Sequence, residues 1–189
     1  MNALVDQIYR DHQSMRAVLD DLEASIAAFA DGDSVDLDKL LTVFDYCAVY
    51  PDLGHHQTED AMLEVLRARK DETVERLAII ETEHMGLSGL VGWLIAQTRA
   101  IQNEAEVSRD HFVTRARDFI LFYRQHMNFE EEQFLPFVTE SFAAADWQAL
   151  DRRLAFLSRA VEDESEASSH RRALRTAYAQ MRRDVLGLG

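Results

Sequence analysis

Apolar residues return at alternating steps of three and four along most of the chain up to Ser141, which is the period of one face of an α-helix. The stripes predict helices over about residues 3–30, 37–66, 77–101 and 112–137, the second of them beginning between Ser34 and Leu37. The proline and the glycine in Tyr50–Gly54 should bend or interrupt the second helix. Pro136 should end or kink the fourth.

The helical pattern restarts after Ser141 and predicts two further helices. Its apolar positions are Trp147, Leu150, Leu154, Leu157 and Val161, followed after a charged break by Leu174, Tyr178, Met181 and Val185. With only two prolines and seven glycines in the chain, the sequence predicts an all-α fold. We expect an antiparallel four-helix unit over residues 1–141. A helical extension over residues 142–189 would pack on that unit or on a partner subunit.

Four of the seven histidines stand on the apolar stripes, one in each predicted helix of the unit: His12, His55, His84 and His126. The midpoints between successive members fall in polar stretches at residues 31–34, 69–71 and 103–106. In antiparallel neighbours, residues equidistant from the connecting turn lie side by side. The four imidazoles should therefore meet at one level of the bundle.

Two glutamates on the same stripes belong to this level. Glu59 follows His55 by four residues and Glu130 follows His126 by four, a spacing that places each pair on one helix face. A buried polar group without a partner costs roughly 2–7 kcal/mol and an ion costs more, so six ionisable residues at one level call for a metal. Four imidazoles and two carboxylates suit two cations that share the carboxylates.

Other polar residues near this level are weaker candidates for metal ligands. His56 should point about 100° away from His55, either behind the ligands or toward solvent. His111 and His170 read as surface residues. Glu131 could replace or join Glu130 if the fourth helix is rotated or over-wound, and Glu81 is either an extra ligand or an ordinary helix-face charge.

The residues expected around the six candidate ligands are mostly apolar. A dry pocket of this kind favours a small neutral ligand, such as dioxygen or nitric oxide, at an open coordination position. Tyr9 and Tyr123 each lie about one turn from a candidate ligand and could donate a hydrogen bond to a bound oxygen.

The net charge and the cysteine content limit which partners and which cellular compartment we expect. A net charge of −14 argues against binding to duplex nucleic acid, which requires clustered Lys and Arg. The single cysteine excludes an internal disulfide and is compatible with a reducing compartment. No apolar run is long enough to span a bilayer. We therefore predict a cytoplasmic protein with no membrane partner, which could form homo-oligomers through the helices after Ser141.

Four segments resemble bacterial hemerythrin-like proteins of the HHE cation-binding group over about the first 140 residues. They are Asp11–His12, the run from Pro51 to Asp60, Glu81–His84, and the run from Tyr123 to Pro136. The resemblance implies an up-down-up-down bundle holding two non-heme iron ions with an oxo or hydroxo bridge. It gives the ligand role to His12, His55, Glu59, His84, His126 and Glu130. Zinc and manganese bind similar donors and rank below iron.

One departure from that family bears on function. Its invertebrate oxygen carriers have a fifth histidine one turn before the position of His84, where this chain has Ile80. One metal would then lack a ligand or recruit Glu81. The favoured hypothesis is a protein that binds, stores or senses dioxygen or a related diatomic. The alternatives are a di-iron enzyme for peroxide, oxygen or nitric oxide reduction or for iron-centre repair, and an iron sensor.

Overall fold

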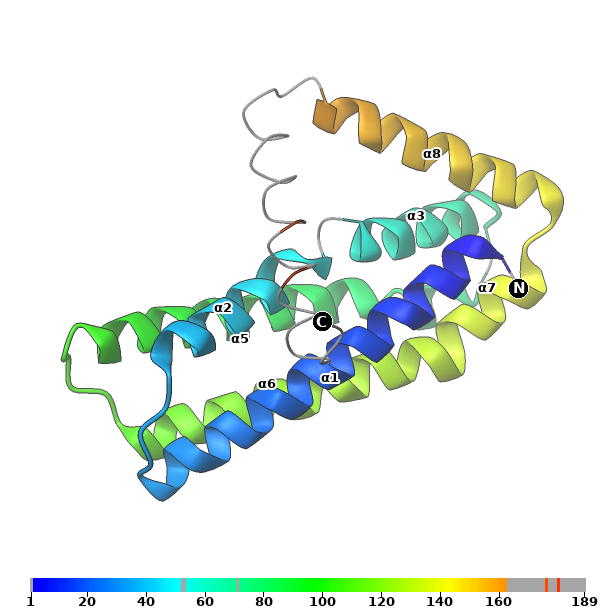
Figure 1. Cartoon of the computed structure of the whole chain (residues 1–189). Coiled ribbons are helices and arrows are strands. Elements are labelled where there is room, and N and C mark those ends of the chain that lie inside the picture. Colours follow the sequence, from blue (N-terminus) through cyan, green and yellow to red (C-terminus); the bar gives the residue numbers. More distant parts are fainter. Residues whose placement is uncertain (1, 52–53, 71, 163–175, 177–179, 181–189) are drawn as a thin grey trace.

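The chain folds into packed helices, as Figure 1 shows. The structure is a computed structural model, and it describes residues 2–51, 54–70, 72–162, 176 and 180. Its elements are α1 (Ala3–Asp31), α2 (Leu37–Val49), α3 (His55–Ala68), α4 (Val74–Leu77), α5 (Ile79–Gln102), α6 (Arg109–Phe129), the π-helical turn η2 (Glu130–Phe134), α7 (Leu135–Ser141) and α8 (Ala144–Glu162). The all-α prediction is confirmed.

The connections lie where the polar stretches predicted them. Helix α1 ends at Gly32, whose φ of 90° is left-handed and whose N–H donates to carbonyls of the last turn. Helix α2 starts after Asp36, whose carboxylate accepts from the N–H of Lys39. The second predicted helix is interrupted around Pro51 into α2 and α3.

The bundle is antiparallel and brings the four predicted helices together. Helix α1 packs against α6, α2 against α5, and α5 against α6 (Figure 1). The fourth predicted helix does not end at Pro136, because the chain remains helical to Ser141. Pro136 stands in the first turn of α7, where a missing N–H costs little. The helix type changes immediately before it.

The apolar core consists of two clusters, one on each side of the histidine level. The first cluster joins α1, α2, α5 and α6 and includes Leu22, Phe44, Leu94 and Phe119. The second joins the start of α1 to α3, α4, α7 and α8 and includes Ile8, Leu63, Phe134 and Leu150. Along α1 the boundary falls between Ile8 and Met15, which is where His12 stands. The polar level is therefore enclosed by apolar packing at both ends.

Helix α8 packs on α3 of the same chain (Figure 1). Leu150 is fully buried in the second cluster, and Arg153 forms a bidentate ion pair with Glu64 of α3, at 2.6 and 2.8 Å. His170 lies outside the described residues, and so does the helix predicted over Leu174–Val185 except for residues 176 and 180. The boundary at residues 141–142 and any homo-oligomer remain predictions.

One further observation concerns membranes. Within residues 2–51, 54–70 and 72–162, no helix has both the length and the apolar composition that crossing a bilayer requires.

Candidate metal centre

The six residues predicted from sequence lie together in the centre of the bundle. His12 comes from the middle of α1, His55 and Glu59 from the first turns of α3, His84 from α5, His126 from the last turn of α6, and Glu130 from the start of η2. Both glutamates are 0% exposed, and His12 and His126 are 1% exposed. Five helical elements, of which α6 and η2 are continuous, thus bring these side chains to one level.

The π-helical turn explains how the last segment stays in register. Buried residues on this stretch follow one another at steps of four: His126, Glu130, Phe134 and Val138. In an α-helix each such step overshoots one 3.6-residue turn by about 40°, so the stripe would rotate away from the core. In η2 the N–H of Leu135 donates to the carbonyl of Glu130, five residues earlier, and the wider turn offsets that rotation.

The two glutamates each reach imidazoles on both sides of the centre. Glu59 has Oε1 at 3.4 Å from Nε2 of His55, and Oε2 at 3.4 Å from Nε2 of His84. Glu130 has Oε2 at 3.1 Å from Nε2 of His12, and Oε1 at 3.0 Å from Nε2 of His126. The carboxylates therefore span two imidazole pairs, His12 with His55 and His84 with His126. Within each pair the ring centroids are 4.9 Å apart.

The inward-facing atoms suit a cation. All four oxygens of Glu59 and Glu130 are buried, and none accepts a hydrogen bond of good geometry from the residues described. The Nε2 atoms of His84 and His126 are also buried and have no hydrogen-bond partner among the described residues. Buried polar atoms are normally satisfied, so this concentration fits metal ligands. Imidazole and carboxylate together suit iron, zinc and manganese.

Each of the four imidazoles has a carboxylate on its outer side. The Nδ1–H of His12 donates to Glu131 at 2.8 Å, and the Nδ1–H of His126 donates to Glu83 at 2.8 Å. Two longer ion pairs complete the set, from Nδ1 of His55 to Asp11 at 3.6 Å and from Nδ1 of His84 to Asp60 at 3.7 Å. Such outer partners fix the ring orientation and leave Nε2 to face a metal.

The surrounding charges keep this site ionised. Burial lowers the pKa of His84, but the carboxylates of Asp60, Glu130 and Glu59 outweigh it and raise that pKa to about 11. Burial also lowers the pKa of His126, yet Glu130 and the outer carboxylate raise it to about 9. Burial favours neutral Glu130, while the neighbouring imidazoles hold its pKa well below the usual range. A cation that binds here therefore has to displace imidazole protons.

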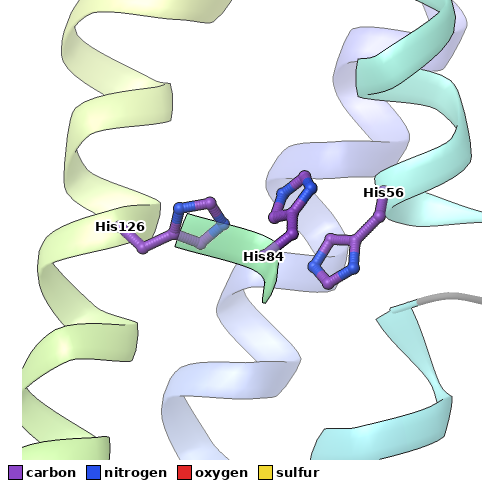
Figure 2. Close-up of side chains that lie close together, drawn as sticks. All are labelled: His56, His84 and His126. Atoms are coloured by element: carbon purple, nitrogen blue, oxygen red, sulfur yellow. The ribbon is translucent and has the colours of Figure 1, made fainter. Parts of the chain in front are cut away.

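His56 also lies at the level of the six candidate ligands. From sequence we expected it either behind those ligands or in solvent. The second alternative is wrong, because His56 is only 8% exposed. As Figure 2 shows, its ring faces that of His84, with centroids 3.7 Å apart and planes 21° apart. Nitrogens of His56, His84 and His126 lie within 4.8 Å of one another. The adjacent histidines at the start of α3 were the sequence signal for this.

The other candidates lie outside the inner donor set. Glu81 forms a bidentate pair with Arg67, at 2.7 and 2.6 Å, and is an exposed helix-face charge. Glu131 does not replace Glu130, because it lies on the outer side of His12 and also binds Arg16 at 2.7 Å. His111 is exposed, as predicted.

A cavity of about 10 Å³ lies against His12 and His55. Its other lining residues are Asp11, Met15, Tyr50, Pro51, Tyr123 and Met127. The volume gives room for about one water-sized molecule. This half of the centre can therefore admit a small ligand beside the imidazoles.

The two tyrosines considered from sequence differ in position. Tyr123 lines the cavity, and burial is the chief reason that its pKa lies well above 10, so its hydroxyl keeps its proton as a donor. Tyr9 lies outside the lining and packs against the second apolar cluster. Of these two tyrosines, Tyr123 is the one placed to donate to a molecule in the cavity.

A helical bundle with a buried cluster of imidazoles and carboxylates defines a cation-binding protein of the all-α class. Residues 3–138, most of the chain, match the family described as hemerythrin HHE cation binding domain. The chain belongs to this family. No curated protein and no solved structure matched it significantly.

Proposed function

We propose that this protein holds two non-heme iron ions and binds dioxygen or a related diatomic molecule, as an oxygen-binding, storage or sensing protein. The ligands would be His12, His55, Glu59, His84, His126 and Glu130. Family membership supports cation binding. The ion number, the identity of the metal and the diatomic ligand are our inference from the donor set.

The main support for the proposal is that each of the two carboxylates reaches both imidazole pairs. Glu59 and Glu130 each place one oxygen toward the His12–His55 pair and the other toward the His84–His126 pair. A single ion could use both oxygens of one carboxylate only if both oxygens faced it, whereas here the two oxygens of each glutamate face different imidazole pairs. Two bridging carboxylates instead match two ions side by side, and their negative charges offset part of the charge of both ions.

The chain's own residues suit a small neutral ligand. When bound, iron supplies an open coordination position and electrons for a diatomic molecule. The residues position that molecule in the cavity next to His12 and His55. The side chains of Met15 and Met127 make the cavity partly apolar, and the Tyr123 hydroxyl can donate to a bound oxygen atom. Apolar packing on both sides limits the access of water to the centre.

Iron content and optical spectra test the proposal together. We expect two irons per chain in protein loaded with Fe(II) without oxygen. Exposure of the reduced protein to air should give an oxygen-dependent charge-transfer band that decays slowly. Oxidation at once without such a band would contradict the binding function and favour a redox enzyme or a sensor. Absence of bound iron would contradict the di-iron centre itself.

Substitutions test the ligand assignment. His126→Ala and Glu59→Ala should each lose metal, whereas His111→Ala, on an exposed position of the same α6 as His126, should keep the full content. Retention of two irons in both centre variants would overturn the proposed ligands. Far-UV circular dichroism of each variant separates metal loss from unfolding.

A further inference from the structure

We propose that His56 is a metal ligand, which completes a three-imidazole position with His84 and His126 and leaves His12 and His55 as the open position. The inference rests on the proposed dinuclear centre and adds a residue to it. Its consequence is an asymmetric pair of ions, in which the small molecule binds at the ion nearer His12.

The geometry of three rings carries the inference. His56, from α3, has its ring centroid 3.7 Å from that of His84 and 6.3 Å from that of His126 (Figure 2). The three residues each offer a nitrogen, and these nitrogens lie within 4.8 Å of one another. They come from three different helices, so local sequence spacing does not force them together.

The three nitrogens can share one ion once the His56 ring rotates. A metal–imidazole bond is about 2.0–2.1 Å for zinc, so three nitrogens spread evenly around one ion are at most roughly 3.6 Å apart. The nitrogens of the three rings, which lie within 4.8 Å of one another, have to approach by at most roughly 1.2 Å to satisfy that limit. Because the rings of His56 and His84 are stacked with planes 21° apart, the ring of His56 has to rotate out of the stack for its nitrogen to face the same ion as His84.

His55 and His56 can bind different ions because they lie at the start of α3. His55 and His56 are its first two residues and project about 100° apart. His55 turns toward His12, with the Nε2 atoms 3.2 Å apart, while His56 turns toward His84. The start of α3 thus faces the centre between its two imidazole pairs.

Helix α5 supplies no second imidazole on the His84 side. The residue one turn before His84 is Ile80, which is 0% exposed and belongs to the second apolar cluster. A third nitrogen donor at this position therefore has to come from another helix. His56 is buried at the required place, whereas Glu81 is engaged by Arg67 at the surface.

The two halves would then differ in what they can accept. The position at His56, His84 and His126 would have three imidazoles plus the carboxylates. The position at His12 and His55 would have two imidazoles plus the same carboxylates, and the cavity lies against it. An incoming molecule would find its free coordination position beside that cavity.

The competing explanation is that His56 only stacks on His84. His56→Phe separates the two, because phenylalanine keeps a flat ring for stacking but has no nitrogen. We would titrate metal-free full-length protein with Co(II), whose visible spectrum reports its ligands, and count bound ions for the wild type and the variant. His111→Phe, the same change on the exposed face of α6, is the matched control.

Ligation predicts that the wild type and His111→Phe bind two Co(II) per chain. His56→Phe should bind one with wild-type affinity and the second at least about tenfold more weakly, since even outer partners of a ligand are worth 10–100-fold. In His56→Ala, added imidazole should restore the second site and its spectrum. This variant keeps the test decisive should His56→Phe misfold.

Other results are equally informative. Two ions bound by His56→Phe with unchanged affinity and spectrum would overturn the role of His56 while leaving the dinuclear centre intact. A His56→Ala variant that imidazole does not restore would also argue against ligation. One Co(II) or none in the wild type would instead contradict the proposed dinuclear centre.

Discussion

The two halves of the centre share both carboxylates but differ in their other surroundings. His12 and His55 form one pair, with a cavity against it. His84 and His126 form the other pair, and the ring of His56 covers His84 at 3.7 Å. If both glutamates bridge two ions, as we propose, the halves would depend on each other for binding a metal. In the centre we propose, the cavity beside His12 and His55 would give a small ligand access to that half, and His56 would add a ligand to the other half.

The largest expected effect comes from a residue that both halves use. Glu130→Ala should abolish binding of both ions, because each would lose a carboxylate oxygen and the remaining ligands would lose a charge that offsets the cations. Glu132→Ala, an exposed position in the same π-helical turn, should keep two ions. Metal analysis after dialysis measures this, and equal iron in the two variants would mean that Glu130 is not a bridge.

A residue of one half should affect one ion. His12→Ala should leave about one ion per chain, bound at the His84 side, and should abolish the oxygen-dependent spectral band, since the cavity lies at His12. His84→Ala should also leave about one ion, now beside the cavity. Complete metal loss in both variants, at unchanged helicity, would show that the halves are not separable.

The outer carboxylates should have a smaller influence. Glu83→Gln replaces the acceptor of the 2.8 Å hydrogen bond from His126 with a neutral group. We expect metal affinity to fall by about 10–100-fold without loss of a site. Glu81→Gln, two residues earlier and paired with Arg67 at the surface, is the control. Titration with Co(II) compares the two, and equal affinities would assign Glu83 a surface role only.

The smallest effect should come from the cavity wall. Tyr123→Phe removes one hydroxyl and should leave two ions bound. A hydrogen bond is worth about 1 kcal/mol, so the dissociation rate of bound oxygen should rise roughly fivefold. Tyr9→Phe, outside the cavity lining, should change nothing. Identical rates in both variants would exclude Tyr123 as a donor to the ligand.

The helices and the histidine level could be predicted from sequence because both follow from periodicity. Apolar steps of three and four residues located the helices, and equal distances from the turns brought the four imidazoles and two glutamates to one height. The π-helical turn could not be predicted in the same way. It compensates the rotation of a four-residue stripe, and only the packing of Glu130 and Phe134 against the core reveals the need for it.

The outer carboxylates show why neighbours in sequence mislead. Asp11 precedes His12 but pairs with His55, and Glu83 precedes His84 but pairs with His126. Adjacent residues on a helix point about 100° apart, so an acidic neighbour serves a ligand on another helix. Because of the same 100° step, we expected His56 to lie outside the set of metal ligands. It reaches the centre because the centre is wide enough to face both of the first two side chains of α3.

The separation of the two metal ions tests the bridging role of Glu59 and Glu130 most directly. X-ray absorption on the full chain loaded with iron measures it. We predict two irons per chain with an iron neighbour at about 3–4 Å, the separation usual for two ions that share ligands. Bound iron with no second iron within about 4 Å would contradict a shared, carboxylate-bridged centre.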